Sequence, residues 1–172
     1  LIKTDAQGDT LWTKTFGGLY DEAGTAVQQT TDGGYIIAGY TDPGNYKFDV
    51  YLIKTDTAGN ALWTRSYGGP DKDWGYGVQQ TTDGGYIITG CTKSYGAGAY
   101  DVWLIKTTSD GSTSWTRTFG GASDDIGYSV HLTSDNGYII TGITHSYGGG
   151  NGDVWLIKTD AQGDTLWTKT FG

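Results

Sequence analysis

Short alternations of apolar and polar residues run along this chain, and none of its segments has the period of a helix. The stretch from Gly75 to Gly121 shows the pattern most fully. Its alternating segments are separated by turn signals such as Asp83-Gly84-Gly85 and Ser109-Asp110-Gly111, which are typical of hairpins. The pattern predicts four short antiparallel strands, at residues 76–83, 86–90, 101–106 and 114–119, with a glycine-rich loop at 93–99.

This unit recurs at a fixed period. The seventeen residues LIKTDAQGDTLWTKTFG occur at 1–17 and again at 156–172, and related segments begin at Leu52 and Leu104. The four starting points are therefore 51, 52 and 52 residues apart. Four antiparallel strands in a repeat of about 50 residues are typical of a β-propeller blade. The sequence therefore predicts an all-β fold built from such blades.

The repeat boundaries divide the chain into a half-blade at about 1–18 and three repeats at about 19–69, 70–121 and 122–172. Three blades are too few to close a ring, because propellers hold about four to eight. We expect other chains, or a longer array from which this segment comes, to complete the ring. A homo-oligomeric ring of two chains is the favoured assembly, and a head-to-tail fibre is the alternative.

Composition and charge limit the partners and surroundings that we expect for this chain. The net charge is −8 and the isoelectric point is about 4.4, which argues against nucleic acid binding. No apolar run reaches the about 18 residues of a membrane span, so we expect no membrane insertion. The single cysteine, Cys91, takes a position held by Tyr40 and Ile143 in the other copies, and we expect it in the core. The chain is expected to be extracellular or on a cell surface.

A tryptophan recurs at one register of the fourth predicted strand. The four positions are Trp12, Trp63, Trp115 and Trp167. One hypothesis is that they bind sugar rings. Their fixed place in alternating strands favours the other interpretation, in which each tryptophan is largely buried between neighbouring blades.

The segments around three of these tryptophans, 5–12, 56–63 and 160–167, share the pattern D-x-x-G-x-x-L-W. This pattern resembles the docking motif of pyrroloquinoline-quinone-type propeller repeats, in which the tryptophan wedges blades together. The third copy departs from it, with Thr108 for Asp and Ser114 for Leu. The whole unit is also similar to glycine-rich repeats of secreted and surface proteins of prokaryotes. The resemblance implies a propeller fold and no particular activity, and it implies no cofactor.

Acidic residues follow the double glycine of each repeat at a constant offset, at Glu22, Asp73 and Asp125. A carboxylate beside a tight loop accepts backbone N–H bonds and fixes the loop, which is the role that we favour. A calcium site is the alternative, because Asp71 and Asp124 lie close by in sequence.

Catalytic patterns are missing from the sequence. The two histidines, His131 and His145, lie in one repeat, and no zinc or Ser/His/Asp motif includes them. The acids that open each third strand, Asp49, Asp101 and Asp153, are expected to cap a loop or to line a channel. In a channel, they would be the candidates for a polysaccharide hydrolase or lyase. We nevertheless predict a protein that is not an enzyme and has no metal site.

The loop between the second and third strands varies most between repeats. It carries aromatic residues among glycines, at Tyr46, Phe48, Tyr95, Tyr100 and Tyr147. Such loops on a rigid scaffold suit recognition of a glycan, while the structural alternative is that the rings pack on the adjacent loop. The sequence thus predicts a non-catalytic module for binding, with polysaccharide as one ligand, or for structural assembly, including a surface filament or coat.

Overall fold

The computed structural model describes residues 1–44 and 46–172, and within them the chain is all-β, with fourteen strands and no helix. No segment of these residues could therefore cross a membrane as a helix. An N-terminal hairpin pairs β1 (Ile2–Thr4) with β2 (Thr10–Thr13). Three four-stranded antiparallel sheets follow, each with its strands paired in sequence order. The predicted four-stranded antiparallel blades are confirmed.

The three blades have nearly the same strand lengths. Blade 1 consists of β3 (Glu22–Gln29), β4 (Tyr35–Thr41), β5 (Asp49–Thr55) and β6 (Ala61–Tyr67). Blade 2 consists of β7 (Asp73–Gln80), β8 (Tyr86–Thr92), β9 (Asp101–Thr107) and β10 (Thr113–Phe119). Blade 3 consists of β11 (Asp125–Leu132), β12 (Tyr138–Thr144), β13 (Asp153–Thr159) and β14 (Thr165–Phe171). The first strand of blade 2 ends before Thr81, earlier than predicted, because the next three residues form the turn.

An aspartate holds the turn between the first two strands of each blade. In blade 2, Asp83 accepts hydrogen bonds from the amide of Gly85 (3.0 Å) and the hydroxyl of Thr81 (2.5 Å). The ammonium of Lys106, on β9, donates to Asp83 (2.8 Å) and to the carbonyl of Thr107 (2.9 Å). The turn is thereby tied to the third strand. The same ion pair recurs as Lys54–Asp32 and Lys158–Asp135.

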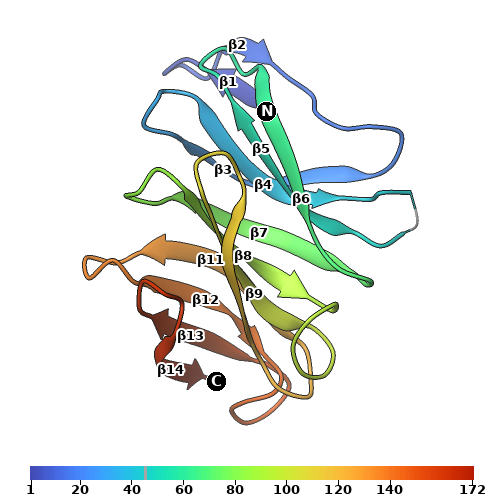
Figure 1. The fold of residues 1–172 in the computed structure, drawn as a ribbon, viewed down its shortest axis with the longest axis vertical. Coiled ribbons are helices and arrows are strands. Elements are labelled where there is room, and N and C mark those ends of the chain that lie inside the picture. Colours follow the sequence, from blue (N-terminus) through green and yellow to red (C-terminus); the bar gives the residue numbers. More distant parts are fainter. Residues whose placement is uncertain (45) are drawn as a thin grey trace.

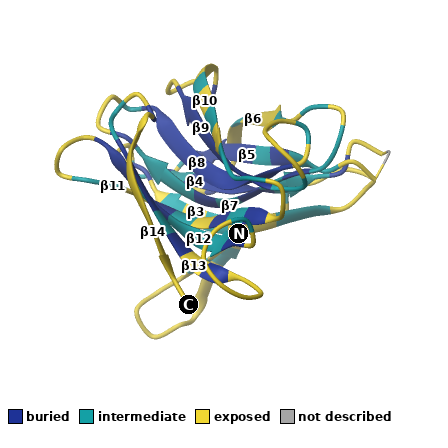
Figure 2. Ribbon diagram, turned by 90° about the horizontal axis from the view of Figure 1, so that it is seen from below, coloured by how far each residue is buried: buried dark blue, intermediate teal, exposed yellow. Residues whose placement is uncertain are grey.

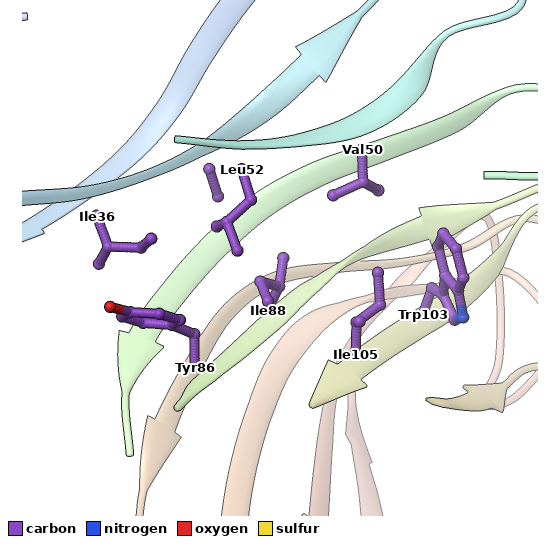
Figure 3. Close-up of a cluster of buried hydrophobic side chains, with 8 residues drawn as sticks. Ile36, Val50, Leu52, Tyr86, Ile88, Trp103 and Ile105 are labelled. Atoms are coloured by element: carbon purple, nitrogen blue, oxygen red, sulfur yellow. The ribbon is translucent and has the colours of Figure 1, made fainter. Parts of the chain in front are cut away.

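The third strand of blade 2 is buried on both faces because a neighbouring blade lies against each of them. On β9, Trp103 and Ile105 join a core with residues of blade 1, and Val102 and Leu104 join a second core with residues of blade 3. Figure 3 shows the first of these cores between the two sheets. Cys91 is completely buried, as predicted, and burial raises the pKa of its thiol to about 12.

The blades follow one another in an open array. Figure 1 shows the N-terminal hairpin and blade 1 at one end and blade 3 at the other, with the chain termini far apart. The first strands of neighbouring blades contact each other, β3 with β7 and β7 with β11. The last strand, β14, is exposed along its whole length (Figure 2). The molecule is therefore an incomplete propeller with two uncovered ends.

Candidate functional site

Each fourth-strand tryptophan that has a blade after it contacts a tyrosine of that blade. The rings of Trp63 and Tyr86 meet edge-on, with centroids 5.9 Å apart. The equivalent pairs, at 5.8 and 5.9 Å, are Trp12–Tyr35 and Trp115–Tyr138. These three tryptophans are half-buried rather than largely buried, because the fourth strand lies at the outer edge of its blade. Trp167 is 42% exposed, since no blade follows it.

The acids that follow the double glycine bind the loops around them. Asp73 accepts hydrogen bonds from the amide of Gly69 (2.9 Å) and the hydroxyl of Ser94 (2.7 Å). Asp125 accepts the equivalent bonds from Gly121 and Ser146, and Glu22 accepts bonds from Gly18 and Thr41. Asp73 and Asp125 therefore join the loop that enters their blade to the loop between the second and third strands, whereas Glu22 joins its entering loop to the end of β4. Among residues 1–44 and 46–172, no three acidic, histidine or cysteine side chains gather into a metal site.

The acids that open the third strands also bind their own loops. Asp101 and Asp153 are 1% and 5% exposed, and they accept hydrogen bonds from the amides of Ala97 (2.6 Å) and Gly149 (2.9 Å). Burial and the nearby charge of Asp125 raise the pKa of Asp101, and burial and Asp73 raise that of Asp49. The positions of Asp101 and Asp153 suit loop capping better than attack on a large external substrate, which has no access to a buried carboxylate.

Two of the loop tyrosines occupy equivalent places. Tyr95 lies on Trp103, with ring centroids 5.4 Å apart, and its hydroxyl donates to the carbonyl of Gly68 (3.0 Å). Tyr147 repeats this arrangement on Trp155 (5.2 Å), with its hydroxyl on the carbonyl of Gly120 (2.8 Å). Both tyrosines remain nearly half exposed, at 46% and 47%. Each ring is thus fixed in place with one part open to solvent.

The other three loop aromatics do not form one surface. Tyr100 stacks on Trp74 with an interplanar angle of 16°, and Phe48 contacts the same tryptophan at 6.1 Å. Tyr46 is 79% exposed, beside the undescribed residue 45. Sequence reasoning did not single out Trp74, because it has no aromatic counterpart in the other repeats.

A groove opens beside the N-terminal hairpin. Its volume is about 390 Å³, and it is lined by Leu1 and Lys14–Phe16, at the open end of the hairpin, and by residues of β3, β4 and β5 of blade 1. We call this side of blade 1 the N-terminal face, which consists of Val27, Tyr35, Ile37, Tyr51 and Ile53. Val27 is 55% exposed, whereas Val130, its equivalent in blade 3, is 3% exposed. Ile37 and Ile53 are only 7% and 5% exposed, so the face is partly covered and its exposed part centres on Val27.

The opposite side of blade 3 is the second uncovered surface. We call it the C-terminal face, which consists of Ile139, Thr141, Val154, Leu156 and Trp167. Val154 is 53% exposed, whereas Val50 and Val102, at the same register of blades 1 and 2, are each 1% exposed. Sequence alternation identifies the members of both faces, but it does not tell which faces lack a neighbour.

No protein-family model matches this chain, and no curated protein matches its sequence. The function is therefore inferred from the geometry of the two faces and the loops.

Proposed function

We propose that this chain is a non-catalytic propeller module that acts by structural assembly, with its C-terminal face docking on the N-terminal face of another copy. The observation that carries this proposal is that the two faces are the two halves of the interface already used inside the chain. Val102 and Leu104 of blade 2 pack against Val130, Tyr138, Ile140, Trp155 and Ile157 of blade 3. The C-terminal face offers the same residue types as blade 2, with Val154 and Leu156 in these positions.

The N-terminal face is equally well matched. Four of its residues are of the same type as their equivalents in blade 3: Val27, Tyr35, Ile37 and Ile53. The fifth differs, with Tyr51 where blade 3 has Trp155. Apolar side chains left exposed at both ends, such as Val27 and Val154, favour contact with a matching surface. Two copies joined in this way at both ends make a six-blade ring without uncovered blade faces, and a head-to-tail fibre is the open alternative.

Multi-angle light scattering over a dilution series tests the assembly. We expect a species of twice the 18.4 kDa chain mass for the ring, or a growing mass for the fibre. The Val154→Asp change should abolish it, because this valine would be buried at the junction as Val102 is. Thr116→Asp, on the exposed edge strand β10, is the matched control and should leave the mass unchanged. A chain that stays monomeric at every concentration contradicts the proposal.

We keep polysaccharide binding as a second candidate because Tyr95 and Tyr147 present equivalent, fixed and half-exposed rings. Sugar rings stack on such aromatic surfaces. A glycan array should show a ligand whose binding falls in Tyr147→Ala and in Tyr95→Ala, while the exposed Tyr20→Ala serves as the control. The absence of any glycan signal counts against this candidate.

The chain's acidity and its single cysteine support the further proposal that it is located outside the cell or on a cell surface.

A further inference from the structure

The hairpin β1–β2 stands where the outer half of a preceding blade would stand. Trp12 contacts Tyr35 as the other fourth-strand tryptophans contact the next blade. The ammonium of Lys14 donates to the amide oxygen of Asn60 (2.9 Å), and Arg117 makes the equivalent contact with Asp164 (3.1 Å) between blades 2 and 3. The two-stranded hairpin thus contacts blade 1 through the same two positions that a complete blade uses to contact the next blade.

No strand among residues 1–44 and 46–172 stands in the place of the inner half of such a blade. The groove beside β1 lies where the first and second strands of a preceding blade would pack. Lys3 is the fourth member of the set of third-strand lysines, and no described carboxylate pairs with it, whereas the other three bind the aspartate of their own first turn. The free edge of β1 likewise has no second strand beside it. The N-terminal face of blade 1 therefore lies beside a groove and is covered by the hairpin only in part.

From these observations we infer that β1–β2 is an internal cap, which occupies the docking site for blade 3 of a second copy and must leave when that blade docks. This inference rests on the proposed function. The hairpin and the β13–β14 segment of blade 3 are identical over seventeen residues, so the incoming blade remakes every contact that the cap loses. It also fills the groove with β11 and β12, which the cap cannot do.

Displacement of the cap is favoured over exchange of strands between the copies. In an exchange, β12 of one copy would leave β13 and pair with β1 of the other. The β12–β13 ladder has seven register pairs, from Tyr138↔Thr159 to Thr144↔Asp153. The strand β1 has three residues, Ile2–Thr4, and offers a shorter ladder. Docking of an intact blade 3 breaks no ladder within that blade, because only the cap moves.

The identical segments supply a matched pair of variants. Trp12→Ala weakens the cap alone, and Trp167→Ala weakens the incoming blade alone, although the two changes fall in the same seventeen-residue sequence. We expect Trp12→Ala to tighten assembly about tenfold in dissociation constant and Trp167→Ala to weaken it by at least as much. Lys14→Ala and Lys169→Ala form a milder surface pair, for which the same opposite signs are expected. Sedimentation velocity over a dilution series gives the constants, and far-UV circular dichroism checks the fold.

The outcomes separate the two proposals. Opposite effects of the two tryptophan changes support the cap. If Trp12→Ala weakens assembly while Trp167→Ala does not, strands are exchanged and the cap is overturned. If only Trp167→Ala has an effect, blades dock but the hairpin does not compete, and the cap is again overturned while the assembly proposal stands. If neither the unaltered chain nor any variant assembles, both proposals fail.

Discussion

Two identical stretches of sequence adopt different structures at the two ends of this molecule. Residues 1–17 form strands of three and four residues, whereas residues 156–172, with the three residues before them, form strands of seven each. Both hairpins keep the same register, since Lys3 pairs with Trp12 and Lys158 pairs with Trp167. The local sequence therefore fixes the turn and the register of the hairpin in both places.

Burial differs between the two copies in opposite directions. Ile157 is 1% exposed and Ile2 is 67% exposed, because β12 and blade 2 cover one and nothing covers the other. Trp12 is half-buried against Tyr35, whereas Trp167 is 42% exposed. The third strand is thus covered by the second strand of its blade and by the preceding blade, and the fourth-strand tryptophan is covered by the next blade. Each copy has only one of these two supports.

The largest difference is expected at the isoleucines. Ile157→Ala should lower the free energy of unfolding by about 2–5 kcal/mol, because it leaves a cavity in a packed core. Ile2→Ala should change it by less than about 0.5 kcal/mol, as at other exposed positions. Urea unfolding of the monomeric chain measures both values. Similar losses at the two positions would contradict the asymmetry of the two copies.

The lysines should show a smaller difference of the same kind. Lys158 bonds to Asp135 (2.9 Å) and to the carbonyl of Thr159 (2.8 Å) with a side chain that is 11% exposed. Lys158→Ala should cost about 1–3 kcal/mol, since the hydrogen bonds of a charged, nearly buried group are lost. Lys3→Ala should be close to neutral, within about 0.5 kcal/mol. Thermal unfolding of the two variants checks this, and a loss at Lys3 as large as that at Lys158 would contradict the expectation that its contact with the Tyr35 ring (5.9 Å) is weak.

The effect of acid on these ion pairs should be the smallest of the three. Burial acts to raise the pKa of Asp83, but hydrogen bonds from Lys106 and Thr81 outweigh it and lower the pKa from 3.8 to about 2. The pair therefore stabilises the fold above about pH 4, and this stabilisation is lost as the pH falls towards 2. Urea unfolding should show Asp83→Asn less stable than the unaltered chain at neutral pH, with the difference vanishing near pH 2. A difference that stays constant with pH would contradict this role.

Much of the fold could be predicted because each repeat carries its own turn and pairing signals. The alternation of strands and the Asp-Gly-Gly turns gave four strands per unit, and the structure confirms them. The partners of the loop side chains were harder to predict. The place of Tyr95 on Trp103, for example, depends on how a loop folds back over a neighbouring strand. The two residues are close in sequence, but the contact is set by the conformation of the glycine-rich loop between them, with Gly96 and Gly98 at positive φ, which the strand pattern does not encode.

The sequence by itself determined the blade, its period and the alternation of its two apolar faces, because short-range hydrogen bonding and side-chain periodicity operate within one repeat. Only the tertiary structure decided which faces are covered. Val102 and Val154 are the same residue at the same register, yet one is 1% and the other 53% exposed. Burial is a property of what lies against a residue, and two identical sequences therefore become a packed blade at one end and a half-supported hairpin at the other.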